Sequence, residues 1–118
     1  MGNLAEVNNE PAAINPSNFM KMSCGDLGGL RQLAIDFFND TRLQMTAWSA
    51  LMEAGNFGKL REDLHRCKGG ASLFGLERLV AMIGSCESPA FLETRGFDVR
   101  GFEIELSVAE TAIEAITQ

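Results

Sequence analysis

The chain contains a single histidine and only three cysteines, and this scarcity limits the chemistry it can perform. Cys24, Cys67 and Cys86 are widely and irregularly spaced, without the paired spacing of a structural zinc site. One histidine cannot complete a mixed cysteine and histidine site either. We therefore expect no metal of the protein's own, and we expect buried, reduced thiols in a cytoplasmic protein.

Long apolar runs and an excess of positive charge are also missing. No apolar stretch approaches the roughly 20 residues that cross a bilayer, and the first residues lack the basic and apolar regions of a secretory signal. We therefore expect no membrane partner. The net charge of −6 argues against general nucleic-acid binding, because proteins with that function normally carry a basic surface.

Helical patterns dominate what the sequence does contain. Residues 1–16 are polar, carry two prolines and show no period, so we expect a flexible head there. Ser17 is expected to cap a short helical turn over 18–22. Apolar residues spaced by three and four then predict longer helices, over 26–54, 57–74, 76–87 and 99–116.

The segment 88–97 contains Pro89 and Gly96 and is predicted to be a loop. No segment shows the strict alternation of apolar and polar residues that is typical of a strand. Four amphipathic helices with short connections favour an all-α fold over residues 17–118. The expected architecture is an antiparallel up-down four-helix bundle with a short extra N-terminal helical turn.

The lone histidine, His65, lies in the helix predicted over 57–74. The apolar side of that helix consists of Leu60, Leu64, Cys67, Ala71 and Phe74. At about 100° per residue, His65 lies beside that side, on a polar, basic and small face. This face also holds Arg61, Lys68, Gly69 and Ser72.

Gly69 and Gly70 each cost a helix interior about 1 kcal/mol relative to alanine. We infer that this cost keeps the surface beside the imidazole open to a partner protein. Neutral imidazole is abundant near pH 7, and its ring nitrogen can act as a nucleophile. Lys68, one turn further along, can reach an anionic group on the ring. The residues predict a nucleophile and a charge stabiliser, without the other parts of a self-sufficient active site.

The run His65-Arg66-Cys67-Lys68-Gly69-Gly70-Ala71, followed by Gly75, resembles the signature of histidine-containing phosphotransfer (HPt) domains. These domains act in the multistep phosphorelays of two-component systems. The resemblance covers about residues 18–118 and implies a four-helix bundle. Cys67 departs from the family's usual Leu or Ile at its position.

The resemblance also implies roles for individual residues. His65 would accept the phosphoryl group, Lys68 would neutralise its oxygens, and Gly69 would leave room for the partner. Glu87 stands where the family often has a Gln or Glu that reaches the imidazole. Arg61 and Ser72 are expected to belong to the same binding face.

By this resemblance the protein is a phosphorelay shuttle, with no kinase activity of its own. It would take a phosphoryl group from a receiver-domain aspartate and pass it to another receiver, or return it. The receiver would supply Mg²⁺. Response-regulator receiver domains and a hybrid sensor kinase are the expected partners, and the protein is expected to be a monomer.

Two other interpretations remain open at this point. One is a non-catalytic module that docks receiver domains and sequesters them. The other is an unrelated four-helix bundle in which the histidine, lysine and glycine occur together by chance. The chain could also be a free-standing protein or the C-terminal domain of a hybrid kinase.

Overall fold

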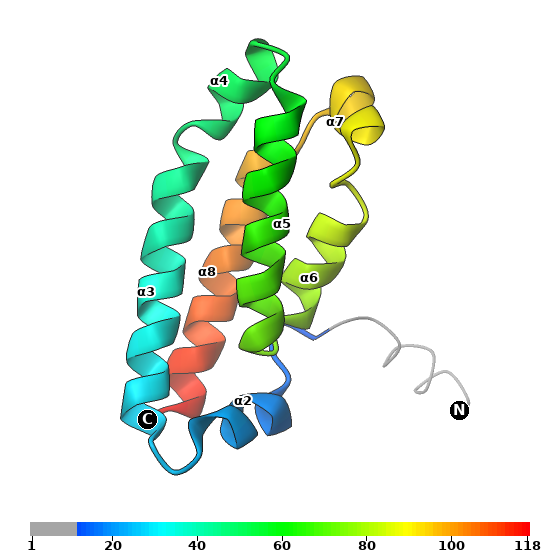
Figure 1. Ribbon diagram of the computed structural model, residues 1–118. Helices are drawn as coiled ribbons and strands as arrows, with labels where there is room; N and C mark the ends of the chain where they lie inside the picture. Colours follow the sequence, from blue (N-terminus) through cyan, green and yellow to red (C-terminus); the bar gives the residue numbers. More distant parts are fainter. Residues whose placement is uncertain (1–11) are drawn as a thin grey trace, which may run out of the picture.

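The computed structural model describes residues 12–118, and every regular element in that range is a helix. Four helices run side by side (Figure 1): α3 (Leu27–Met45), α5 (Phe57–Leu73), α6 (Glu77–Gly84) and α8 (Val99–Ile116). Three others cover the ends: α2 (Pro16–Ser23), α4 (Trp48–Glu53) and α7 (Pro89–Arg95). None of the helices in this range is long and apolar enough to span a membrane.

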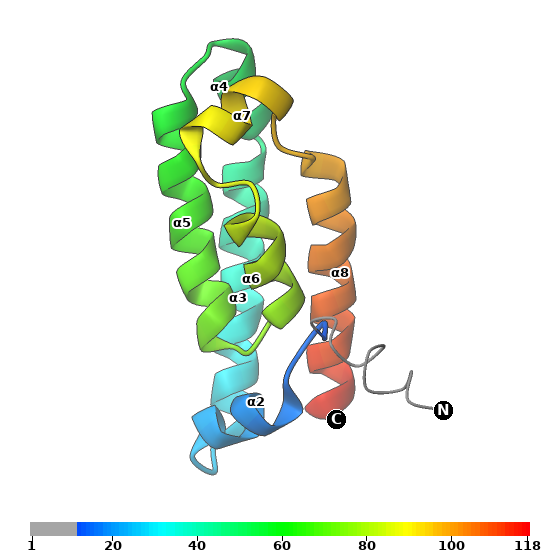
Figure 2. The ribbon, with the colours of Figure 1, turned by 90° about the vertical axis from the view of Figure 1, so that its right-hand side faces the viewer.

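Helices α3, α5, α6 and α8 form the sides of a bundle. Helix α3 contacts α5 and α8, and α6 also contacts both α5 and α8. Figures 1 and 2 show that the chain reverses direction from each of these helices to the next, with α5 and α8 at opposite corners. The predicted all-α, antiparallel up-down bundle is therefore confirmed.

Aromatic packing closes the end of the bundle where α4 and α7 lie. The rings of Trp48, Phe97 and Phe102 contact one another with centroids 5.3 to 5.6 Å apart. The Trp48 indole Nε1–H donates to Oδ2 of the buried Asp63 at 3.2 Å, and Lys59 binds the other carboxylate oxygen at 3.0 Å. The buried carboxylate is thus paired, as burial of a charge requires, and it ties α4 to α5 two residues before His65.

The prediction of a single helix over 26–54 is wrong, because the chain forms two helices there. Between α3 and α4 the Thr46 hydroxyl donates to the Leu43 carbonyl at 2.6 Å, and the Ala47 N–H donates to Gln44 instead of Leu43. Such local bonds compete with the α-helical pattern. The break lets Trp48 become fully buried, which the continuing apolar spacing did not reveal.

The loop predicted over 88–97 is also corrected, since most of it forms α7. Ser88 caps this helix by accepting the Phe91 N–H at 3.1 Å, and Pro89 occupies its first turn. Proline fits that position because its missing N–H would have no helical partner there. The Ser-Pro pair that ends one helix therefore also begins the next, and Leu92 anchors α7 in the core.

The predicted head requires a correction over residues 12–16. Asn15, and not Ser17, caps α2 by accepting the Asn18 N–H at 3.2 Å. Ile14 is buried, and the Asn15 N–H donates to the Gly75 carbonyl at 2.8 Å. Backbone bonds to the turn between α5 and α6 thus attach this segment to the bundle. The remainder of the predicted head, residues 1–11, lies outside the described residues.

The three cysteines are free thiols with different surroundings. Cys67 and Cys86 are buried as expected, and burial raises the pKa of the Cys67 thiol to about 11. Cys24 is exposed, contrary to expectation, because it follows the last turn of α2 at the surface.

Candidate functional site

His65 lies in the middle of α5 with 63% of its side chain exposed. The apolar side of the helix is anchored by Leu60, Leu64, Cys67 and Ala71, all of them buried. Because these side chains fix the rotation of α5, the imidazole projects from a rigid backbone. The structure therefore agrees with the expected exposed histidine beside an apolar seam.

The carboxylate of Glu87 joins His65 to Lys68. Its Oε2 lies 3.3 Å from Nδ1 of His65, and its Oε1 accepts a hydrogen bond from the Lys68 ammonium. An ionised carboxylate can only accept hydrogen bonds, so the neutral ring carries its proton on Nδ1 in this contact. The lone pair of the other nitrogen, Nε2, is then available as a nucleophile.

Glu87 reaches α5 because α6 ends earlier than predicted, at Gly84 instead of residue 87. The Ser85 hydroxyl and the Cys86 thiol both donate to the Met82 carbonyl, at 2.9 and 3.0 Å. Cys86 is buried, which fixes the connection between α6 and α7 against the bundle. The Glu87 side chain, only 17% exposed, is thereby held over the α5 surface.

The charges in this group favour an ionised carboxylate. The hydrogen bond from Lys68 is the largest effect and lowers the pKa of Glu87. Burial opposes it as the next largest effect, and the hydrogen bond with His65 lowers the pKa further. Lys68 and the imidazole, which were expected to lie close together, are thus joined through the Glu87 carboxylate that both contact. The ammonium carries three hydrogens, so its bond to Glu87 leaves others for an additional acceptor.

The two glycines after Lys68 have different roles. A Cβ added at Gly69 would meet no atom within 4 Å, so this position leaves the surface open. A Cβ at Gly70 would lie 2.5 Å from Cε1 of Phe37. The Phe37 ring also contacts Phe74, with centroids 5.6 Å apart. The inference that both glycines serve access is therefore corrected, because Gly70 allows the α3 ring to pack against α5.

Arg61 and Ser72 are exposed on either side of His65 along α5. Within residues 12–118, neither forms a hydrogen bond with His65, Lys68 or Glu87. The site therefore consists of a compact three-residue group with flanking residues on the same helix. In the same part of the chain, no group of three or more His, Cys, Asp or Glu side chains is arranged to hold a metal ion.

A profile of the Hpt domain family matches residues 23–118, which is most of the chain. The chain belongs to the Hpt domain family. Hpt domains have a histidine phosphotransfer role in two-component phosphorelays and interact with receiver domains, and this general role applies here. Comparisons with curated proteins and with solved structures gave no significant match.

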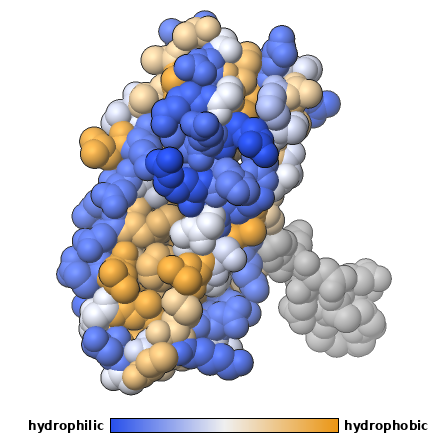
Figure 3. Space-filling view, viewed as in Figure 1, coloured by the Kyte–Doolittle hydropathy of each residue, from blue (hydrophilic) through white to orange (hydrophobic). Residues whose placement is uncertain are grey.

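Beside its histidine, this Hpt domain exposes an apolar patch that sequence reasoning missed. We define the patch as Met22, Leu33 and Leu73, which are 38%, 59% and 54% exposed. Figure 3 shows hydrophobic surface over the lower halves of α3 and α5, below a hydrophilic area. Leu33 belongs to the apolar residues spaced by three and four along α3, yet it is exposed. Its position one turn before Phe37, which packs on α5, was the available signal.

A hollow of about 620 Å³ lies next to this patch, between α2 and α5. Met22 and Leu73 line it together with Gly69 and Ser72. The open position at Gly69 therefore continues into a depression with an apolar wall. This arrangement extends the accessible surface of the Hpt domain from His65 toward α2.

The two glycines should respond differently to substitution. Gly69→Ala should raise the free energy of unfolding by about 0.5–1 kcal/mol, because alanine favours the helix and the space is open. Gly70→Ala should lower it by about 1 kcal/mol, since the added methyl group displaces the Phe37 ring. Urea unfolding of both variants measures the difference. Equal stabilities would contradict the distinct roles assigned to the two positions.

Glu87 should contribute stability that depends on pH. Its pKa is lowered in the folded protein, so the contribution is present above the ordinary carboxyl pKa of 4.5 and disappears as pH falls through the folded value. Glu87→Gln should therefore cost about 0.5 kcal/mol at pH 7, and much less at pH 3. Thermal unfolding of both proteins across this range measures the gap, which should also shrink in high salt. A gap independent of pH would exclude an electrostatic role.

Proposed function

We propose that His65 is the phosphoryl carrier of this Hpt domain. It would accept the group from a receiver-domain aspartate and pass it to another receiver domain, or back to the first. The observation that carries this proposal is the exposed imidazole of the chain's only histidine, with its Nδ1 beside the Glu87 carboxylate. The assignment rests on this geometry together with the family.

The proposed reaction is a direct transfer between the two proteins. The lone pair of His65 Nε2 attacks the phosphorus of the receiver's aspartyl phosphate. The N–P bond forms while the P–O bond to the aspartate breaks, and the aspartate leaves with the bonding electrons. The phosphorylated ring then carries positive charge, which the Glu87 carboxylate stabilises through the Nδ1–H. The reverse transfer follows the same steps in the opposite order.

Lys68 acts on the group that is transferred. The phosphoryl oxygens are negative, and the ammonium can donate to them with hydrogens that its bond to Glu87 does not use. Glu87 thus keeps the neutral imidazole and the Lys68 ammonium near one another before the phosphoryl group arrives. Mg²⁺, which neutralises charge in the transition state, would be bound by the receiver domain.

The docking surface in this proposal combines the His65 face with the apolar patch. Gly69 lies between them and adds no side chain that would hold the partner away. Interfaces commonly have an apolar centre with a polar rim, and Arg61 and Ser72 supply polar groups along α5. A hybrid sensor kinase is the proposed source of the phosphoryl group, and the cytoplasm is the proposed location.

Phosphoryl transfer to His65 is the first property to measure. Incubation with a phosphorylated receiver domain and Mg²⁺ should label the protein with acid-labile, alkali-stable phosphate, as expected for phosphohistidine. His65→Gln should remain folded, because the side chain is exposed, and should take up no label. Label retained by that variant would exclude His65 as the carrier. Binding of several receivers without any transfer would favour the sequestering module.

Access at Gly69 gives a second test. Gly69→Leu should slow transfer at least about tenfold, because a side chain beside the imidazole displaces the partner from its reactive geometry. Gly28→Leu is the matched control, since Gly28 is also an exposed helical glycine with open space around its Cα. The control should transfer at the unsubstituted rate. Equal rates for both variants would contradict the access argument.

A further inference from the structure

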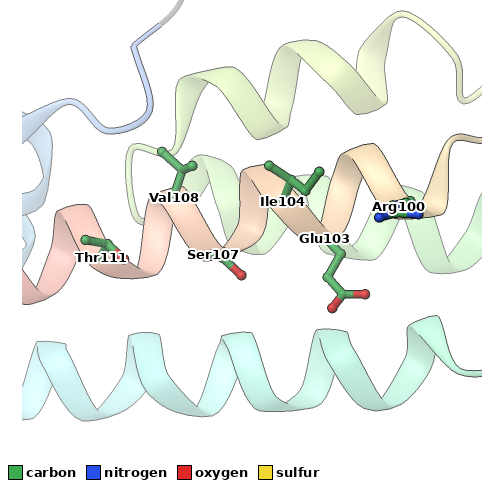
Figure 4. Close-up of a pocket in the computed structure, with 6 residues that line it drawn as sticks. All are labelled: Arg100, Glu103, Ile104, Ser107, Val108 and Thr111. Atoms are coloured by element: carbon green, nitrogen blue, oxygen red, sulfur yellow. The ribbon is translucent and has the colours of Figure 1, made fainter.

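Helix α8 exposes an apolar face on the side of the bundle away from His65. Ile104 is 61% exposed and Val108 is 41% exposed. With Arg100, Glu103, Ser107 and Thr111 they line a hollow of about 760 Å³ along the outer side of the helix (Figure 4). The buried residues of α8, among them Phe102 and Leu106, lie on its other side. At the edge of this face, Arg42 of α3 donates to the Ser107 hydroxyl at 3.4 Å and forms an ion pair with Glu110 at 2.9 Å. The side chains of Ile104 and Val108 remain exposed.

Two of the charges on this face, Arg100 and Glu114, are placed symmetrically about Ser107. At about 100° per residue, Arg100, Ser107 and Glu114 fall within roughly 40° of arc on α8. Arg100 lies seven residues before Ser107, and Glu114 lies seven residues after it. Among the ion pairs of the described residues, none involves Arg100 or Glu114. The positive charge of Arg100 thus stands at one end of the apolar stretch and the negative charge of Glu114 at the other. The carboxylate of Glu103 lies one turn after Arg100 on the same face.

We propose that this face binds a second copy of the chain, with the two α8 helices antiparallel about a two-fold axis at Ser107. In that register Arg100 faces Glu114 of the partner subunit, and the same ion pair repeats at the other end. The side chains of Ile104 and Val108 from both copies are then covered in the centre. The small side chains at Ser107 and Thr111 let the helix axes approach to the usual distance of about 8–10 Å.

Charge complementarity favours a second copy over other occupants. A helix that carries a negative and a positive charge 14 residues apart, running antiparallel, satisfies both ends of this face. The chain's own α8 has this spacing. In a parallel dimer each Arg100 would face Arg100 of the partner subunit. A single helix pair is a small interface, and the net charge of −6 opposes association, so the dimer is weak.

This dimer would leave both phosphotransfer faces free. Helices α5 and α8 occupy opposite corners of the bundle (Figure 2), so the helix that carries His65 lies away from the partner in each copy. Two receiver domains could therefore dock on one dimer. The inference differs from the expected monomer and is independent of the proposed role of His65.

Sedimentation velocity tests the proposal directly. From about 10 µM to about 1 mM protein, the mass should rise from that of the monomer toward that of the dimer. Ile104→Glu should weaken association at least about tenfold, because it places charge in the apolar centre. Leu43→Glu is the matched control, since Leu43 is an exposed apolar residue on α3, and it should associate normally. A monomer at every concentration would overturn the proposal.

Charge exchange tests the register. Arg100→Glu and Glu114→Arg should each weaken self-association at least about tenfold, because like charges then meet at both ends. An equimolar mixture of the two variants should associate as strongly as the unchanged protein, since opposite charges meet again. The chain with both substitutions should also recover. Both positions are exposed and the new charges suit the helix dipole, so folding is retained. A mixture that stays monomeric would exclude this arrangement.

Discussion

The Glu87 carboxylate is the contact on which the organisation of the site depends. It accepts from Lys68 and lies against His65 Nδ1, so one side chain sets the tautomer of the imidazole and holds a cation nearby. The connection that carries it comes from a different part of the chain. Its position depends in turn on the early end of α6 and on the burial of Cys86. The group of His65, Lys68 and Glu87 therefore forms only when α5, α6 and the connection that follows α6 are packed together.

The bundle separates the surfaces of the protein by their chemistry. One corner, α5, carries the histidine and leads through Gly69 to the apolar patch, whereas the opposite corner, α8, carries the self-complementary face. The packing between them is anchored at one end by the Trp48–Asp63 hydrogen bond and the aromatic cluster around it. Because this core holds α5 in place, the imidazole is exposed while the backbone that carries it is fixed.

Several elements were predictable because their signals are local. The apolar spacing of α5 and α8 indicated both helices and their buried sides, and the lone histidine directed attention to the face of α5. The division of 26–54 was not predictable from spacing, since the apolar period continues through the break at Thr46. The helix α7 was missed because Ser88-Pro89 was interpreted only as an end, although the same pair is a strong helix start.

By itself, the sequence determined that the fold is helical and in which order the long helices follow one another. It also determined that His65, Lys68 and Gly69 share one helix face and that they form the Hpt signature. These are properties of residues within about two turns of one another, where helix geometry dictates proximity. Only the tertiary structure decided that Gly70 accommodates Phe37 from another helix, and that one carboxylate, that of Glu87, contacts both His65 and Lys68. Such contacts depend on how whole helices pack, and no local pattern encodes the side chain that arrives from a different helix.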